Sequence, residues 1–371
     1  MPQYWIWLSQ RTGIGNKAKL ELVGHFGSAA ALWQAQDYSA LDLSETAKKS
    51  LQDKDLSEAE HALWQCRNLG ISVLCAGDEA YPRRLRNIAD PPIVLYYKGT
   101  LPAFDREAVV GVVGTRRASA YGMMAAERIS RQIAERGGVV VSGLAAGIDA
   151  QAGWGAIHGG GCTVAVLGGG VDVVYPATNL DLHRAVEQQG CILSEYPPGT
   201  KPTKWTFPQR NRIVSGLSCA ILVVEAPEKS GTMITARYAS EQGRDVFVVP
   251  GHIDSPFCAG SNALLRDGAR LATCGWDILR EYQGLFPDKL EKQASAPAAQ
   301  PESVAAPKPV RFDQATGDEQ AILQILLQGD RSVDDLIVES GLEPQKALAT
   351  LTMLELKGMV TTLPGRKVTL A

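Results

Sequence analysis

Several features that direct a chain to a membrane or out of the cell are missing from this sequence of 371 residues. No stretch approaches the roughly 18 apolar residues of a membrane helix, so we expect no membrane segment. The first residues, MPQYWIWLSQRTG, have neither the basic start nor the long apolar run of a secretory signal. The seven cysteines are scattered, odd in number and without a CxxC pair, which favours reduced thiols in a cytoplasmic protein.

Motifs for metal, cofactor and catalytic chemistry are also missing. The five histidines show no HxxxH or HxH spacing, so we expect no metal. The chain has no GxxxxGK[ST] phosphate loop, the turn VVGTRRAS lacks GxGxxG, and Ser142 lacks a GxSxG frame, so we expect no cofactor and no enzyme. The formal net charge is only −3, which means that any surface for nucleic acid has to be a local one.

Periodicity and composition divide the chain into four segments. Residues 1–70 carry helical patterns and predict a small helical domain. Residues 71–285 alternate short apolar runs with helical stretches, which predicts an α/β core with a Rossmann-like, doubly wound, mostly parallel sheet. Residues 286–312 are an Ala/Pro-rich linker, and residues 313–371 form a separate small unit.

The small unit at the end has the pattern of a winged helix. Three short helical segments follow one another, and Ser332 and Glu343-Pro344 are start signals for the second and third. The segment MVTTLPGRKVTLA then predicts a hairpin that turns at Pro364-Gly365. Three helices followed by a hairpin predict a C-terminal winged-helix domain.

Small residues follow the predicted strands of the core. The strands are expected at 108–113, 139–143, 162–170, 191–197, 219–226 and 245–251. Four of them lead into turns that would suit an anion: VVGTRRAS (112–119), VSGLAAGID (141–149), LGGGVDVVYP (167–176) and EAPEKSGTMITA (225–236). The carboxyl ends of parallel strands meet at one edge of a sheet, where backbone N–H groups and helix N-termini can approach an anion closely.

A predicted loop, KWTFPQRNRIVSG (204–216), gathers Lys204, Arg210 and Arg212 around Trp205 and Phe207, with no carboxylate among them. With Arg116 and Arg117 of the first turn, these residues suit a nucleic-acid strand. The cations would contact phosphates, and bases would stack on the rings at roughly 1–3 kcal/mol each. The alternatives are glycine turns that serve packing alone and a loop whose cations decorate the surface rings.

Three carboxylates, Asp149, Glu195 and Glu225, fall near the ends of the predicted strands. Paired carboxylates can do acid–base chemistry. We favour the interpretation that they cap helices or orient the arginines.

An ordered set of motifs over about residues 80–275 carries a family resemblance. The motifs are VVGTRRASAYG, VVVSGLAAGIDAQA, TVAVLGGGVDVVYPATN, LSEYPPGTKPTKWTFPQRNRIVSGLS, VVEAPEKSGTMITARYASEQGRDVFVVPG and GSNALLRDGA. Together they resemble the DNA-processing protein A family, also called DprA or Smf. The N-terminal segment is similar to the sterile-alpha-like or helix-hairpin-helix domain of many members, and the tail is similar to their winged-helix domain.

The resemblance implies a function without catalysis. Family members bind and protect single-stranded DNA, load a RecA-type recombinase onto it during natural transformation, and act as dimers built on the Rossmann-like domain. The family's DNA pocket, carried over onto the matching positions, implies the DNA-binding residues Gly114, Arg116, Arg117, Ser142, Gly143, Lys204, Phe207, Arg210, Asn211 and Arg212.

One departure and two competing functions remain. Gly153 stands where the family usually has His, and we expect this position to be structural. A Rossmann-like nucleotide or phosphoribosyl hydrolase is the alternative function, but Ile234 and Thr235 occupy the positions where such enzymes carry a catalytic carboxylate. A transcription regulator is disfavoured because the expected recognition helix, EPQKALATLTMLELKG, holds two lysines and no arginine.

Overall fold

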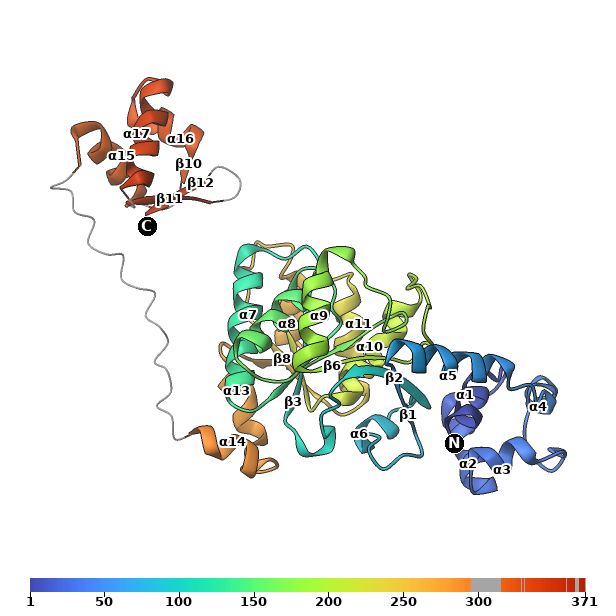
Figure 1. Ribbon diagram of the computed structural model, residues 1–371. Helices are drawn as coiled ribbons and strands as arrows, with labels where there is room; N and C mark the ends of the chain where they lie inside the picture. The colour runs from blue at the N-terminus through green and yellow to red at the C-terminus, as the bar shows by residue number, and fades with distance from the viewer. Residues whose placement is uncertain (295–314, 328, 330, 358, 364–366, 371) are drawn as a thin grey trace. The chain divides into compact units, whose positions relative to one another are not determined.

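The computed structural model describes residues 1–294, 315–327, 329, 331–357, 359–363 and 367–370. These residues fall into two compact units, one within Met1–Ser295 and the other within Ala296–Ala371 (Figure 1). The prediction of a linker at residues 286–312 is wrong at its start. Residues Pro287–Ala294 form the helix α14, and Leu290 is fully buried in the core of the first unit. The rest of that predicted linker, residues 295–312, lies outside the described residues.

The first unit begins with helices, as expected for residues 1–70. Ser28 and Ser44 cap two of them by accepting hydrogen bonds from the N–H groups of Ala31 and Ala47. Gly70 ends the last one in the left-handed conformation, with φ at 64°. The helices are α1 (Pro2–Gln10), α2 (Asn16–Phe26), α3 (Ala29–Gln34), α4 (Glu45–Gln52) and α5 (Ser57–Leu69).

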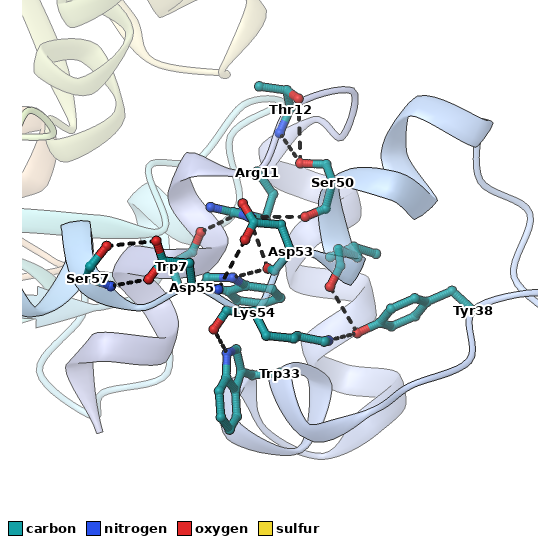
Figure 2. Close-up of polar contacts among 11 residues, drawn as sticks. Trp7, Arg11, Thr12, Trp33, Tyr38, Ser50, Asp53, Lys54, Asp55 and Ser57 are labelled. Atoms are coloured by element: carbon teal, nitrogen blue, oxygen red, sulfur yellow. Dashed lines mark hydrogen bonds and ion pairs between the residues drawn. The ribbon is translucent and has the colours of Figure 1, made fainter.

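The connection between α4 and α5 is fixed by a polar network (Figure 2). The Trp7 indole donates to the carbonyl of Asp53 at 2.7 Å, and the Trp33 indole donates to the carbonyl of Lys54 at 3.1 Å. The Arg11 guanidinium pairs with the Asp53 carboxylate at 2.8 Å. Two indoles and one arginine thus anchor the backbone of a short connection to the helices that surround it.

Among the described residues, the first unit holds a nine-stranded sheet. Neighbours in it pair in parallel except where β1 pairs with β2 and β2 with β6. The structure confirms the six predicted strands, while β1, β2 and β9 were not predicted. In spatial order the strands are β1 (Ser72–Cys75), β2 (Val94–Gly99), β6 (Cys191–Ser194), β5 (Thr163–Val166), β4 (Val139–Ser142), β3 (Val109–Val113), β7 (Ala220–Val223), β8 (Asp245–Val248) and β9 (Arg270–Leu271).

Helices cover both faces of this sheet, as its buried strands require. Alternate residues of β3 enter different cores: Val110 and Val112 pack in the core that α7 and α8 help to form, while Val109 and Val113 share a core with α10. The remaining helical elements are α6 (Arg83–Arg86), η1 (Phe104–Arg106), α7 (Ala120–Glu135), α8 (Ile148–His158), η2 (Ala177–Asn179), α9 (Leu180–Gln189), α10 (Thr206–Leu217), α11 (Gly231–Glu241), α12 (Ala259–Arg266), α13 (Gly275–Leu279) and η3 (Arg280–Tyr282).

The chain order of the sheet reverses beside β3. From β3 the chain moves through β4 and β5 to β6, and it then returns to place β7 on the other side of β3. Val110 accordingly pairs with Val140 on one side and with Ala220 on the other. In open α/β sheets, such a reversal leaves a crevice at the carboxyl ends of the two diverging strands.

The second unit has the predicted order of three helices and a hairpin. Ser332 caps α16 by accepting a hydrogen bond from the N–H of Asp335 at 3.1 Å, and Pro344 is the first residue of α17. The predicted turn at Pro364-Gly365 lies outside the described residues, but the strands on either side of it pair antiparallel. The elements are α15 (Gly317–Leu326), β10 (Arg331–Ser332), α16 (Val333–Ser340), α17 (Pro344–Leu356), β11 (Val360–Leu363) and β12 (Lys367–Leu370).

Candidate nucleic-acid interface

A cavity of about 390 Å³ opens where β3 and β7 diverge. Four segments form its walls: the turn after β3, the segment from β4 into α8, the start of α10 and the turn after β7 with the first residues of α11. Its volume lies in the range of small-molecule sites. The residues that line it are Val113, Gly114, Thr115, Arg116, Arg117, Ala145, Asp149, Phe207, Pro208, Arg210, Asn211, Pro227, Lys229, Ser230, Gly231, Thr232 and Thr235.

An arginine and an aromatic ring meet in this lining. The guanidinium carbon of Arg116 lies 4.7 Å from the centroid of the Phe207 ring, in cation–π contact. The Tyr175 ring centroid lies 5.5 Å from that of Phe207. Arg116 and Arg117 are exposed, and no carboxylate pairs with either side chain within the described part of the chain. The pair therefore combines an exposed positive charge, which acts at a distance on the buried Asp149, with a flat apolar face.

Residues 204–216 were predicted as a loop, and that prediction is wrong for most of the segment because α10 begins at Thr206. Pro208 is its third residue, where the missing N–H costs no helical hydrogen bond. Lys204 and Trp205 precede the helix, and the Lys204 ammonium lies 5.1 Å from the Trp205 ring centroid. Trp205 is 71% exposed, so its ring faces solvent rather than the protein core.

Arg210 is buried at the base of the cavity, with only 4% of its surface exposed. Its guanidinium donates to the carbonyl of Val166 at the end of β5 and to the side-chain oxygen of Asn211. A Cβ atom on Gly143 would lie 2.2 Å from Arg210 Nη2, so this glycine makes room for the guanidinium. Asp149 accepts a hydrogen bond from the Gly143 N–H at 3.1 Å. Burial raises the pKa of Asp149, while the Arg210 charge acts in the opposite direction.

Arg212 points away from the cavity lining and forms a buried ion-pair network. Its guanidinium lies 2.8 Å from an Asp90 oxygen and 2.7 Å from a Glu195 oxygen. Burial alone would lower the pKa of Arg212, but the carboxylates of Glu195 and Asp90 outweigh it and raise that pKa above its usual value. This arginine is held inside the protein, whereas the sequence suggested a cation for phosphate.

The small residues at the strand ends have packing partners. A Cβ atom on Gly114 would lie 2.4 Å from Ile148 of α8, and the Ser142 hydroxyl donates to the carbonyl of Val112 at 2.8 Å. A Cβ on Gly153 would lie 3.2 Å from Leu182, which agrees with a packing role there. Six of the ten candidates line the cavity, namely Gly114, Arg116, Arg117, Phe207, Arg210 and Asn211. The four that are not part of that lining are Ser142, Gly143, Lys204 and Arg212.

The three carboxylates have the structural partners that we favoured. The Glu225 side chain accepts hydrogen bonds from both the N–H and the hydroxyl of Ser119, at 2.9 and 2.5 Å, where α7 begins. Glu195 pairs with Arg212, and the Arg210 charge acts on Asp149. One of them caps a helix and the other two interact with the buried arginines.

Several residues of the cavity were not named as site residues from the sequence, although the turns that contain them were predicted to suit an anion. The turn after β7 supplies Lys229, Ser230, Gly231 and Thr232, and Thr115 comes from the turn after β3. The sequence signal for the first four was the position of KSGT between an apolar strand and a helix, which is where a helix N-terminus can meet an anion. With these residues the lining holds four cations (Arg116, Arg117, Arg210 and Lys229) and one carboxylate, Asp149.

The lining of the cavity suits a ligand that has both an anionic group and a planar ring. Positive charges with low-dielectric walls attract phosphate groups, and the Phe207 ring offers a stacking surface for a base.

No group of three or more His, Cys, Asp or Glu residues in the described ranges is arranged to hold a metal ion. All seven cysteines are free thiols. None of the helices that the structure describes is long and apolar enough to cross a membrane.

Two family models match the sequence. The model for DNA recombination-mediator protein A matches residues 72–283, which form the sheet and the cavity. The chain belongs to the DNA recombination-mediator protein A family. A second model, the DprA winged helix domain, matches residues 294–366 and confirms the winged helix predicted for the tail. Membership in a family of recombination mediators confirms that the chain is not an enzyme and removes the hydrolase alternative.

Known members of the family are similar over much of their length. The DNA processing protein DprA of Bacillus subtilis is 42% identical over 215 residues, which cover 58% of this chain and 72% of that protein. The X-ray structure of DNA processing protein A from Streptococcus pneumoniae superimposes with a TM-score of 0.66 at 34% identity, over 76% of this chain and 98% of that one. DNA processing protein A from Helicobacter pylori gives a TM-score of 0.52 at 32% identity, over 59% and 97% of the two chains, in a structural study of its single-stranded DNA binding mode. The fold expected from the resemblance is thereby confirmed.

Proposed function

We propose that this chain binds single-stranded DNA in the cavity between β3 and β7 and acts there as a recombination mediator. The observation that carries the proposal is the contact of the exposed Arg116 guanidinium with the Phe207 ring in the cavity lining. A DNA phosphate pairs with the Arg116 guanidinium, and an unpaired base stacks on the Phe207 ring. A base inside a duplex cannot offer its face in this way, so the site selects single strands.

We assign direct contact with DNA to Arg116, Arg117, Lys204 and Phe207, whose side chains are exposed or half-buried. The other six candidates have supporting roles. Arg210 and Asn211 form the base of the cavity, Gly143 admits the Arg210 guanidinium, and Arg212 fixes α10 through its buried ion pairs. Gly114 and Ser142 set the close approach of the strand ends. This division follows from the partners of the buried arginines, because a guanidinium that already binds protein groups is not free to bind a phosphate.

We further propose that the bound strand passes to a RecA-type recombinase during natural transformation, and that the chain acts in the cytoplasm as a homodimer built on residues 71–285. Support for the DNA-processing role comes from the relatives of Bacillus subtilis and Streptococcus pneumoniae, which are named DNA processing proteins. The free thiols agree with a reducing compartment. Residues 1–70 would form a SAM-like or helix-hairpin-helix domain, and residues 313–371 would contact protein or assist the core.

A binding titration tests the central proposal. Fluorescence anisotropy would follow labelled single-stranded and duplex oligonucleotides of equal length at several salt concentrations. We expect tighter binding of the single strand, with an affinity that falls linearly on a logarithmic salt scale because phosphate neutralisation releases counterions. Equal affinity for both forms, or no binding of the single strand at low salt, would contradict the proposal.

A further inference from the structure

Four strand-to-helix turns lie at the carboxyl edge of the sheet beside the proposed site, and in three of them one backbone donor is bound to a protein acceptor. After β3, Thr115 N–H donates to the carbonyl of Glu225 at 2.8 Å, and Glu225 also caps α7. After β4, the N–H of Gly143 donates to Asp149 at 3.1 Å. After β5, the N–H of Gly170 donates to the carbonyl of Thr200 at 2.9 Å. One backbone donor in each of these three turns is thus occupied by the protein.

In the turn after β7, no backbone N–H of residues 228–232 donates to another described residue. No side chain caps the N-terminus of α11, so the first-turn N–H groups of this 11-residue helix lack an intrahelical partner. The hydroxyl of Ser230 is buried without a hydrogen-bond partner. Thr232 is 6% exposed and lines the cavity, and its hydroxyl makes no hydrogen bond with any described residue. Backbone and side-chain donors therefore converge there without an acceptor.

Neighbouring side chains hold this turn in place. The Asn211 amide donates to the carbonyl of Gly231 at 3.2 Å, and the Thr235 hydroxyl donates to the same carbonyl at 3.4 Å. Lys229 lines the cavity and is exposed, and it adds a positive charge to that of the helix N-terminus. The carboxylate of the lining, Asp149, accepts the Gly143 N–H and faces Arg210. The turn is thus ordered in the absence of a ligand.

We propose that the N-terminus of α11, with the hydroxyls of Ser230 and Thr232, binds one phosphate of the nucleotide whose base stacks on Phe207. The inference rests on the proposed function and deepens it. Arg116 and Phe207 line the same cavity as the turn after β7, so one nucleotide meets both. The phosphate is a backbone phosphodiester of the strand, and a terminal phosphate or a free nucleotide offers the same chemistry.

Displacement of a labelled oligothymidine tests this subsite. Inorganic phosphate, thymidine and thymidine monophosphate would each compete with the oligonucleotide on the full chain. In the wild type, the monophosphate should displace at a concentration about tenfold lower than thymidine, the usual effect of a hydrogen bond to a charged group. Thr232→Val removes the hydroxyl and should abolish most of that difference, while the matched Thr232→Ser control should retain it.

A folded Thr232→Val variant with the wild-type ratio of the two affinities would overturn the subsite. If that variant does not fold, as judged by its circular dichroism, Ser230→Ala provides the same comparison. Failure of the wild type to bind oligothymidine refutes the proposed function. Normal oligothymidine binding without any preference for the monophosphate over thymidine refutes the subsite alone. Adding a 5′-phosphate to the oligonucleotide distinguishes the two sources: equal sensitivity to Thr232→Val indicates a backbone phosphate, and sensitivity of the phosphorylated strand alone indicates a strand end.

Discussion

Replacing Arg116 by alanine should change the salt dependence of single-strand binding by the amount that one phosphate contributes. The Arg116 side chain is exposed and has no carboxylate partner in the described ranges, so its charge is available to DNA. Each neutralised phosphate of a single strand contributes about 0.7 to the slope of log K against log salt. Arg116→Ala should therefore flatten the slope by about 0.7. When salt rises from 50 to 200 mM, the affinity of the variant should then fall by a factor about 2.6 times smaller than that of the wild type.

The contact with Phe207 adds a second component that a lysine separates. The guanidinium carbon lies 4.7 Å from the ring centroid, within the range of a cation–π interaction worth about 0.5–1 kcal/mol at an exposed site. Arg116→Lys keeps the charge but loses the planar group, so we expect the wild-type slope with a modest fall in affinity. Phe207→Ala should cost about 1–3 kcal/mol of binding free energy, as expected for the loss of base stacking, and should leave the slope unchanged.

Anisotropy titrations at four salt concentrations would measure both components. Arg280→Ala is the matched control. Arg280 begins η3, whose Tyr282 hydroxyl lies 2.5 Å from Asp245 at the start of β8, so the control lies at the amino-terminal edge of the sheet, opposite the cavity. We expect wild-type binding from this variant. An Arg116→Ala protein with the slope and affinity of the control would refute the assignment of the cavity as the DNA site.

Three further outcomes follow from the structure. Gly143→Ala should lower the free energy of unfolding in urea by about 1–3 kcal/mol through overpacking, because the new Cβ would lie 2.2 Å from the Arg210 guanidinium. The control Gly24→Ala has open space around its Cβ and should stabilise α2 by about 0.5–1 kcal/mol. Burial and the Arg11 charge lower the pKa of Lys19 from 10.5 to about 8. Between these two pH values the unfolded chain binds more protons than the folded one, so the free energy of unfolding should rise with pH across this window. Lys19→Met should flatten that rise. Ending the chain after residue 295 should leave single-strand affinity nearly intact, because the cavity is lined by residues from 113 to 235, and loss of all binding by this variant would move the site to the tail.

The sequence predicted the centre of the sheet because its strands are buried on both faces. Runs such as AVVGVV and CAILVVEA contain few polar residues, and the strands that they predict, β3 and β7, are fully buried. β9 was missed because it has two exposed residues and no apolar run. β1 and β2 do contain short apolar runs, VLC and VLYY, but both strands are partly exposed and were not predicted from them.

The helical state of α10 and the burial of Arg210 could be read from the sequence only in retrospect. Arg210, Ile213, Val214 and Leu217 follow the i, i+3, i+4, i+7 spacing of one helix face, and the structure buries all four. The arginine occupies a core position of that stripe, which the charge and Pro208 obscured. Its acceptor, the carbonyl of Val166, belongs to a strand far away in the sequence. Such a pairing depends on tertiary structure and leaves no local pattern.

The position of β3 between β4 and β7 has a consequence for synthesis of the chain. A nascent chain that has folded only as far as β6 already holds β3 against β4, but the other edge of β3 stays open until Ala220–Val223 emerge. Up to that moment the cavity lacks the turn after β7, which supplies Lys229, Ser230 and Thr232 to its lining. We therefore expect the complete DNA site to form only after the long-range pairing of β3 with β7. Conversely, a bound strand stabilises that pairing, so the ligand protects a contact between segments far apart in the sequence.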